Sequence, residues 1–572
     1  MKTFSELSRV PARDGRPSPA LVLSLRLITA SLAFVFALQL ASSRAHAQPA
    51  SQRGRPNAVQ RGGASTSELS AAARSSLDAA VEALQRDALA DAERAARVAV
   101  GAAPRSPVAR NVLGVVLDRL GRRDEAVAEF DAAIRLDPDF VGARNNLART
   151  LAERGRTAEA VAEFERVLKV DPTHAQARFN LGSLHAATGD FAKAAEHFAR
   201  ARATSPDDAR LALAFLSVAY RAGRKAEADA AADTVERAAL SDARALFTLA
   251  TVLAQSNQYE RAARLYARVN ELTPRTYEVL YNLGVALYNL ERGEEAARHL
   301  AEAADLNPDP AETHFRLGLI ASERGDSANA VEELRHAVER DPKSANYRHL
   351  LGREYFRAGF WEGAIAEFTR AAEIEPAQAQ HYLSRADANY RKGEAAAAAA
   401  DFDRAAELDP KIENIGYWQG YTHRVAGDFE VARRRLEKFV AAHPAHADAL
   451  ASLGFIAIEQ GRLEEAEQPL RRALELDAKN VPALYDYARV ALKRRDYAEA
   501  VSRFEHVVEK HPAYTQAYYQ LFLAHTRLKQ TEKAQAALAE FKRLEGLEKQ
   551  TTQERMADDK VRTQQMLGQS PR

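Results

Sequence analysis

The hydrophobic residues of this chain recur with a helical period, and the segment from Pro107 to Phe140 shows the pattern well. Apolar residues in its first half lie three and four positions apart, at Val112, Leu113, Val116, Leu117 and Leu120. This spacing places them on one face of an α-helix. The segment is therefore predicted to begin with an amphipathic helix. Gly121 follows it directly and offers the left-handed conformation in which many helices end.

The second half of the segment predicts another amphipathic helix, over residues 124–136. Its apolar face consists of Ala126, Val127, Phe130, Ala133 and Ile134. Asp137-Pro138 stops this helix, because the residue before a proline is pushed out of the helical region. Two short helices joined by a glycine turn make a helical hairpin.

The hairpin pattern repeats every 34 residues without an insertion. A series of alanines keeps the same period, with an alanine at every step of 34 residues from Ala92 to Ala534. Self-similarity at this period predicts a solenoid of stacked helical hairpins. A proline ends most of the units, and Leu240 and Ala478 stand in its place in two of them. These prolines are Pro104, Pro138, Pro172, Pro206, Pro274, Pro308, Pro342, Pro376, Pro410, Pro444 and Pro512.

Small and large residues also keep fixed places within the unit. The first helix carries a small residue at Gly114, Ala148, Gly182, Ala250, Gly284, Gly318, Gly352, Ala386, Gly420, Gly454 and Ala488. The second helix carries a large one at Phe130, Phe164, Phe198, Tyr266, Leu300, Leu334, Phe368, Phe402, Leu436, Leu470, Phe504 and Leu538. We expect the small residues of the two helices to face each other and the large residue to fill the gap to the next helix.

These positions resemble the tetratricopeptide repeat. The residues that carry the resemblance in one unit are Leu113-Gly114, Leu117, Gly121, Ala126, Phe130, Ala133 and Pro138. The resemblance covers residues 73–548 and implies an all-α, right-handed superhelical solenoid of about fourteen hairpins, whose first helices line a continuous groove. The copy over residues 216–240 lacks the small residue and the proline, so we expect it to be the weakest unit.

One position departs from the family pattern. The leading tryptophan slot holds Arg110, Arg144, Arg178 or Arg348 in several units. We expect the stems of these arginines to lie over neighbouring helices rather than to bind a ligand.

Asparagines and aromatic residues mark the expected groove. In arrays that this one resembles, asparagines at the positions of Asn146, Asn180 and Asn282 hydrogen-bond the backbone of an extended peptide. An alternative is that these asparagines cap local groups only. One position earlier, aromatic residues accumulate at Phe179, Phe247, Tyr281, Phe315, Tyr417, Tyr485 and Tyr519, with Trp418 and Tyr421 on the same helix as Tyr417.

Aromatic residues at helical spacing pack in cores more often than they bind ligands. In these helices, however, Leu and Gly already fill the core positions, which favours exposure of the aromatic rings in the groove. Tyr and Trp are also the residue types that anchor interfaces.

Composition narrows the function classes. The formal net charge is +1, which gives no electrostatic indication of nucleic-acid binding. The chain has no cysteine, so disulfides, thiolate zinc sites and thiol nucleophiles are excluded. The sequence contains no phosphate-binding glycine loop with lysine, no G-x-S-x-G elbow and no H-E-x-x-H motif. We therefore expect no enzyme activity, no metal and no cofactor.

The N-terminus predicts export. A basic and polar start, the apolar run 27–41 and the small-x-small triplet at 45–47 match a secretory signal peptide over residues 1–47, or an uncleaved anchor that would hold the chain at a membrane. Residues 48–72 are rich in Gly, Pro, Gln, Ser and Arg and predict a flexible linker. Residues 549–572 are polar and predict a C-terminal tail. We expect a periplasmic or secreted location.

The sequence thus predicts a non-enzymatic scaffold that binds a protein or an extended peptide in its groove. Two alternatives stay open. One is a periplasmic accessory of polysaccharide or cell-wall assembly, whose aromatic groove contacts glycan. The other is a regulatory subunit of a separately encoded enzyme.

Overall fold

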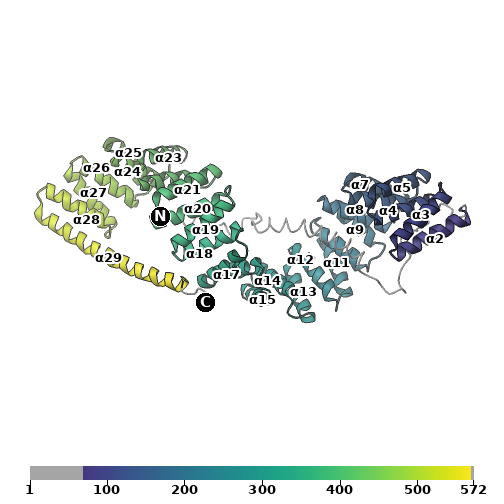
Figure 1. Cartoon of the computed structure of the whole chain (residues 1–572). Coiled ribbons are helices and arrows are strands. Elements are labelled where there is room, and N and C mark those ends of the chain that lie inside the picture. The colour runs from purple at the N-terminus through teal and green to yellow at the C-terminus, as the bar shows by residue number, and fades with distance from the viewer. Residues whose placement is uncertain (1–68, 568–572) are drawn as a thin grey trace. The chain divides into compact units, whose positions relative to one another are not determined.

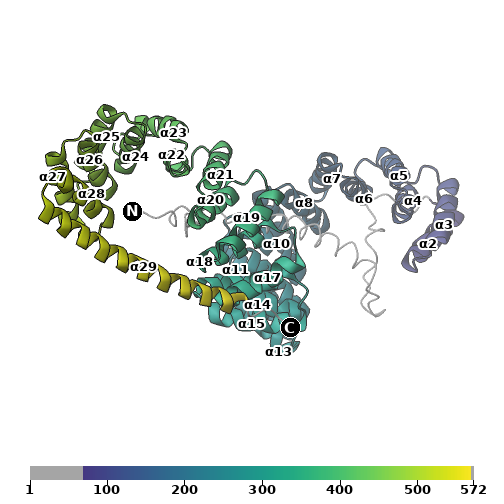
Figure 2. The ribbon, with the colours of Figure 1, turned by 60° about the vertical axis from the view of Figure 1, so that its left-hand side comes forward.

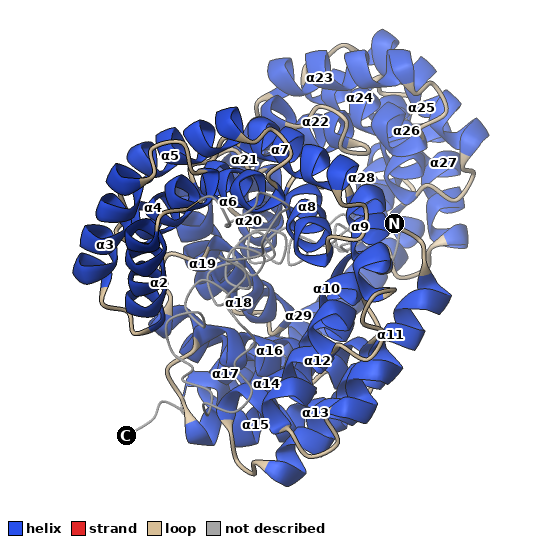
Figure 3. Cartoon of the chain, turned by 90° about the vertical axis from the view of Figure 1, so that its right-hand side faces the viewer, coloured by secondary structure: helices blue, strands red, loops and turns tan. Residues whose placement is uncertain are grey.

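The computed structural model of the chain describes residues 69–567, with side chains up to residue 554. All regular elements in this range are helices, and none of them is a strand (Figure 3). The all-α prediction is therefore confirmed. The predicted signal peptide and residues 48–68 of the predicted linker lie outside the described residues.

The described chain divides between Ala296 and Ala297 into two compact units. The helices of the N-terminal unit follow one another in chain order (Figure 1). They are α2 (Ala71–Gln85), α3 (Leu89–Ala102), α4 (Pro107–Arg119), α5 (Arg123–Leu136), α6 (Val141–Glu153), α7 (Thr157–Val170), α8 (Ala175–Ala187), α9 (Phe191–Arg202), α10 (Ala209–Ala219), α11 (Lys225–Ala238), α12 (Ala243–Gln255), α13 (Tyr259–Leu272) and α14 (Tyr277–Asn289), and the boundary falls inside α15 (Gly293–Leu306).

The C-terminal unit continues the same alternation of short helices. Its helices are α16 (Ala311–Glu323), α17 (Ser327–Arg340), α18 (Ala345–Arg357), α19 (Trp361–Ile374), α20 (Ala379–Lys392), α21 (Ala395–Leu408), α22 (Ile415–Ala426), α23 (Phe429–Ala442), α24 (Ala447–Glu459), α25 (Leu463–Leu476), α26 (Val481–Lys493), α27 (Tyr497–Lys510), α28 (Thr515–Arg527) and α29 (Thr531–Leu567). Within this unit the hairpins from α20 to α28 follow an arc (Figure 2). The last helix, α29, includes most of the residues predicted as a tail.

Even-numbered helices are the first helices of the hairpins and odd-numbered helices are the second. Several first helices contact each other directly, as α4 contacts α6 in the N-terminal unit and α22 contacts α24 in the C-terminal unit. The first helices of a unit therefore form a continuous surface. We call the surface formed by α18, α20, α22, α24, α26 and α28 the first-helix face of the C-terminal unit. None of the described helices is long and apolar enough to cross a bilayer.

The two helices of a hairpin pack through the small and large positions. A Cβ atom added to Gly352 would lie 2.7 Å from the Phe368 ring, and one added to Gly454 would lie 2.4 Å from Leu470. The large residue therefore occupies the space over the small residue of its own hairpin. Phe402 in this position also stacks on Trp418 of the next helix, as expected. The alanines that recur every 34 residues are buried, with 0% exposure for thirteen of them and 5% for Ala534.

The turn inside each hairpin has a left-handed residue at one fixed position. Nine of these residues are the glycines predicted for this place, with φ between 74° and 95°. In the other five hairpins the position is held by Asp87, Asn257, Glu291, Arg495 and Lys529, with φ between 58° and 65°. The 34-residue register therefore fixes the turn conformation even where the sequence lacks glycine.

The arginines in the tryptophan position form a polar clasp. Arg348 Nε donates to the carbonyl of Pro342 at 2.9 Å, and its Nη1 lies 2.9 Å from the Glu367 carboxylate on α19. Arg110 and Arg144 bind the carbonyl of the proline six residues earlier and a glutamate of the second helix in the same way. The clasp ties the incoming turn to both helices of a hairpin. These arginines are structural, as expected, but they act through their guanidinium groups as well as their stems.

We predict that Arg348→Ala lowers the unfolding free energy of the C-terminal unit by about 2–4 kcal/mol. The substitution leaves the Glu367 carboxylate and the Pro342 carbonyl without a donor in a nearly buried site. Native-state hydrogen exchange of α18 and α19 measures the effect. Arg348→Lys should recover less than half of it, since an ammonium group cannot reproduce the guanidinium fork.

The matched control is Arg472→Ala, which removes an ion pair whose side chains are more than half exposed. This change should cost less than about 1 kcal/mol. Equal losses for the two alanine variants would contradict the clasp.

Candidate functional site

One position of the first helix carries charged or aromatic residues in five consecutive hairpins of the C-terminal unit. Stepping by 34, it holds Arg353 on α18, Asp387 on α20, Tyr421 on α22, Phe455 on α24 and Arg489 on α26. Because the hairpins are equivalent, these five side chains occupy the same place in successive units. They form a row along the first-helix face.

Arginines and aromatic rings alternate along the later part of this row and the residues beside it. The guanidinium of Arg424 lies 4.8 Å from the ring centroid of Tyr421 and 4.7 Å from that of Phe455. The guanidinium of Arg489 lies 5.7 Å from the Phe455 centroid and 5.9 Å from that of Tyr485. Each contact is a cation–π interaction, which favours a charged group stacked on a ring face. We call these five residues of α22, α24 and α26 the arginine–aromatic ladder.

The two arginines of the ladder differ in their polar partners. Arg489 binds the carboxylates of Asp486, at 2.8 Å, and Glu459. Arg424 has no hydrogen-bond acceptor among the described residues, and its buried Nε is unsatisfied. Arg424 therefore has hydrogen-bond donors without a protein acceptor.

The predicted aromatic residues of α22 lie together. Tyr421 and Tyr390 on α20 place their hydroxyl oxygens 3.0 Å apart. Trp418 stacks on Phe402 and meets Tyr421 edge-on at 6.0 Å. Tyr417 is only 7% exposed and packs on Trp418, so the expectation that its ring is exposed in a groove is wrong. This ring supports the half-buried rings beside it.

The other predicted aromatic residues of the C-terminal unit are scattered. Phe315 is 4% exposed and packs on Tyr347 at 4.8 Å, so groove exposure is also wrong for this ring. Tyr347, on the first helix of the next hairpin, is large enough to cover it. Tyr485 belongs to the ladder and accepts a hydrogen bond from Gln520. Tyr519 is 40% exposed and lies beside Phe541.

The predicted residues of the N-terminal unit do not form one cluster. Asn146 donates from Nδ2 to Asn111 Oδ1 at 3.0 Å, and Asn180 Oδ1 accepts from Gln176 at 3.0 Å. Phe179 packs on Phe198.

Two further predicted residues lie on α14. Asn282 donates to the Glu278 carbonyl one turn back, which is a local hydrogen bond within α14. Tyr281 stacks on Tyr277 at 5.8 Å.

Two buried histidines couple α18 to α20. His349 Nδ1 lies 3.0 Å from His381 Nδ1, and the two side chains are 8% and 5% exposed. Burial, together with a smaller effect of the neighbouring His381, lowers the pKa of His349 to about 3. The pair is therefore neutral at physiological pH, with one ring donating to the other.

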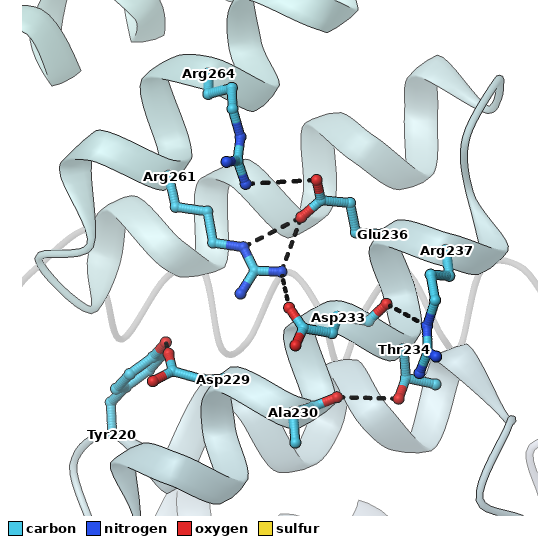
Figure 4. A network of polar contacts seen from close by, with 9 residues as sticks. All are labelled: Tyr220, Asp229, Ala230, Asp233, Thr234, Glu236, Arg237, Arg261 and Arg264. Atoms are coloured by element: carbon cyan, nitrogen blue, oxygen red, sulfur yellow. Dashed lines mark hydrogen bonds and ion pairs between the residues drawn. The ribbon is translucent and has the colours of Figure 1, made fainter.

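A charged network joins the second helices α11 and α13 of the N-terminal unit (Figure 4). Arg261 binds Asp233 at 2.6 Å and Glu236 at 2.8 Å, and Arg264 lies 3.5 Å from Glu236. This network borders a hollow of about 930 Å³, where Leu240 is 69% exposed at the position of the missing proline. Acidic and basic groups neutralise one another there, so the hollow has no charge that would select a partner.

No group of three potential metal ligands occurs among residues 69–554.

Sequence reasoning did not identify Arg424, Phe455 and Arg489. For Phe455 and Arg489 the available signal was the 34-residue row that they share with Tyr421, whose N-terminal members are Val115, Arg149, Ser183, Ser217, Thr251 and Val285. Arg424 lies outside this row, one helical turn after Tyr421.

The tetratricopeptide repeat models match residues 69–140, 145–209, 281–345, 349–411, 417–481 and 491–543, which is more than half of the chain. The chain belongs to the tetratricopeptide repeat family. Residues 210–280, which include the weakest predicted copy, are not matched, yet the structure forms helices α10 to α13 there. The array keeps its hairpins even where the family pattern is lost.

Several solved structures are similar to this array at low identity. The crystal structure of YrrB, a TPR protein with an unusual peptide-binding site, is 20% identical over 32% of this chain and 93% of its own, with a TM-score of 0.30. Yeast Tom70 is 15% identical over 80% and 96%, with a TM-score of 0.28. Naa15/Naa10 bound to HypK-THB is 14% identical over 87% and 98%, with a TM-score of 0.32. No curated protein matches the chain.

We predict that acid destabilises the C-terminal unit through His349. Above pH 6.5 His349 is neutral in both states. Between pH 6.5 and 3 the unfolded chain binds a proton that the folded protein excludes, so stability falls by roughly 1.4 kcal/mol per pH unit. Thermal melting at pH 7 and pH 5 measures the change.

His349→Phe should remove most of this pH dependence, because phenylalanine does not titrate. The fold should accept the ring, since other hairpins hold an aromatic residue at the same position. His506→Gln, a change at a half-exposed histidine on α27, should leave it unaltered. A pH dependence that persists in His349→Phe would contradict the assignment.

Proposed function

We propose that this protein is a non-enzymatic scaffold that binds a protein or peptide segment on the first-helix face of the C-terminal unit. The arginine–aromatic ladder is the observation that carries this proposal. Tetratricopeptide arrays are typically scaffolds without catalytic activity. The ladder adds a specific place to that general property.

The ladder has the composition of an interface anchor. Trp, Tyr and Arg dominate the energetics of protein interfaces, because their large planar groups bury much area and lose few degrees of freedom. Tyr421, Phe455 and Tyr485 are half-buried, so part of each ring stays accessible. The cation–π contacts hold the rings in place before a partner arrives, and this preorganisation lowers the cost of binding.

The proposal includes export from the cytosol. It is supported by the basic start, the apolar run and the small-x-small triplet in residues 1–47. Expression of the full chain in a Gram-negative host, followed by fractionation and N-terminal sequencing, tests this part. We expect a periplasmic protein whose N-terminus lies near Gln48. A full-length protein in the cytosol would contradict it.

For binding, we predict that an unconstrained displayed peptide library yields peptides that bind the full chain with micromolar affinity. Phe455→Ala should weaken these peptides at least tenfold, since it removes the ring that stacks on both arginines of the ladder. Fluorescence anisotropy measures the affinity.

The control is Ile374→Ala, which truncates a 39% exposed apolar residue at the end of the second helix α19. This variant should bind as the wild type does. Peptides that bind Phe455→Ala with unchanged affinity would contradict the proposed site. If oligosaccharides bind and no peptide does, the partner class is wrong.

A further inference from the structure

Three charged side chains on consecutive first helices lack their hydrogen-bond complement. They are Arg353 on α18, Asp387 on α20 and Arg424 on α22. Among the described residues, neither arginine has a hydrogen-bonding or ion-pairing acceptor, and neither oxygen of Asp387 accepts a hydrogen bond. Their charges alternate along the face in the order positive, negative, positive.

Asp387 is the most unusual of the three. It is 4% exposed, and its nearest cation is Arg391, whose Nε lies 3.6 Å away, beyond hydrogen-bond distance. Burial raises the pKa of its carboxyl to about 6. A buried carboxylate without donors destabilises the folded protein, because it has lost its water and gained little in return. Arg391 itself is 37% exposed, and at this distance it leaves both oxygens of the Asp387 carboxylate without a hydrogen-bond donor.

The two arginines likewise lack hydrogen-bond acceptors. Burial lowers the pKa of Arg353, and Arg357 beside it adds repulsion. Arg424 is held between the rings of Tyr421 and Phe455 with its donors unused. A guanidinium fixed in this way is suited to bind a carboxylate through two parallel hydrogen bonds.

The neighbouring arginines show that this is not general to the array. Arg489 and Arg385 are bound by carboxylates within their own units. Arg353, Asp387 and Arg424 therefore differ from these two arginines in having no hydrogen-bond partner.

We propose that the first-helix face of the C-terminal unit binds an extended acidic–basic–acidic segment of a partner protein, with a basic side chain on Asp387 and acidic side chains on Arg353 and Arg424. The inference rests on the proposed function and specifies the chemistry of the partner. The pattern reads the same in both directions, so the segment can run either way along the face.

Geometry sets the spacing of the pattern. Packed helices lie about 8–10 Å apart, and an extended chain advances about 3.3 Å per residue. One step between first helices therefore corresponds to about three residues of the partner. The expected pattern is Glu-X2-Lys-X2-Glu, with Asp or Arg as equivalents.

Two displayed libraries of equal size test the proposal on the full chain. One has the form X2-Glu-X2-Lys-X2-Glu-X2, and the other has the charges reversed, X2-Lys-X2-Glu-X2-Lys-X2. We expect the first library to be enriched at least tenfold over the second in 50 mM salt, with a smaller difference at high salt because exposed charges are screened. Equal enrichment, or preference for the reversed library, would overturn the proposal.

Variants of the protein locate the contacts. Arg424→Gln and Asp387→Asn should each weaken the selected peptides at least tenfold. Asp387→Asn should also raise the melting temperature, since it removes a buried charge, so weaker binding cannot then be attributed to misfolding. Arg472→Gln, on the second helix α25, should leave binding unchanged. Unchanged binding to Asp387→Asn would overturn the role of this carboxylate.

The two proposals fail in different ways. If the unconstrained library yields peptides that depend on Phe455 but show no charge pattern, the inference is wrong and the proposed function stands. If no library yields a peptide, both are wrong.

Discussion

The structure depends on the packing of a large side chain of one helix over a glycine or alanine of its partner helix. In most hairpins a Gly or Ala of the first helix leaves a hollow that a Phe, Tyr or Leu of the second helix fills, as Phe368 does over Gly352. A single methyl group at the glycine would fall within about 3 Å of the ring, so the approach of the two helices is set to a few tenths of an ångström. Repeated every 34 residues, this fixed approach gives all first helices the same orientation within a unit and so creates their shared face.

Polar contacts replace the aromatic residue that the family pattern places at the start of the hairpin. Arg348, bound to the Pro342 carbonyl and to Glu367, holds the incoming turn by directed hydrogen bonds rather than by apolar area. His314 makes the equivalent pair of contacts with Pro308 and Glu333. Different residue types can therefore serve this position, provided that they reach the same carbonyl and the same carboxylate.

The two units use their first helices differently. In the N-terminal unit, side-chain amides such as Asn111 and Asn146 satisfy one another. In the C-terminal unit, charges and rings alternate, and Asp387 is buried without a hydrogen-bond donor. Unsatisfied buried charge lowers the stability of the folded protein. The C-terminal face is thus the part of the molecule in which stability and proposed function oppose each other.

The sequence by itself determined the period, the hairpins and their turns. These follow from local rules, since the spacing of apolar residues selects helices and a proline or left-handed residue ends them. It also indicated Tyr421 and Tyr485 as residues of the face.

Only the tertiary structure decided which side chains of that face are exposed or paired. Phe315 is covered by Tyr347, while Phe455 lies between Arg424 and Arg489. The reason is physical: exposure of one residue depends on the size and charge of side chains about 34 positions away on the next hairpin, and a pattern within one helix carries no information about them.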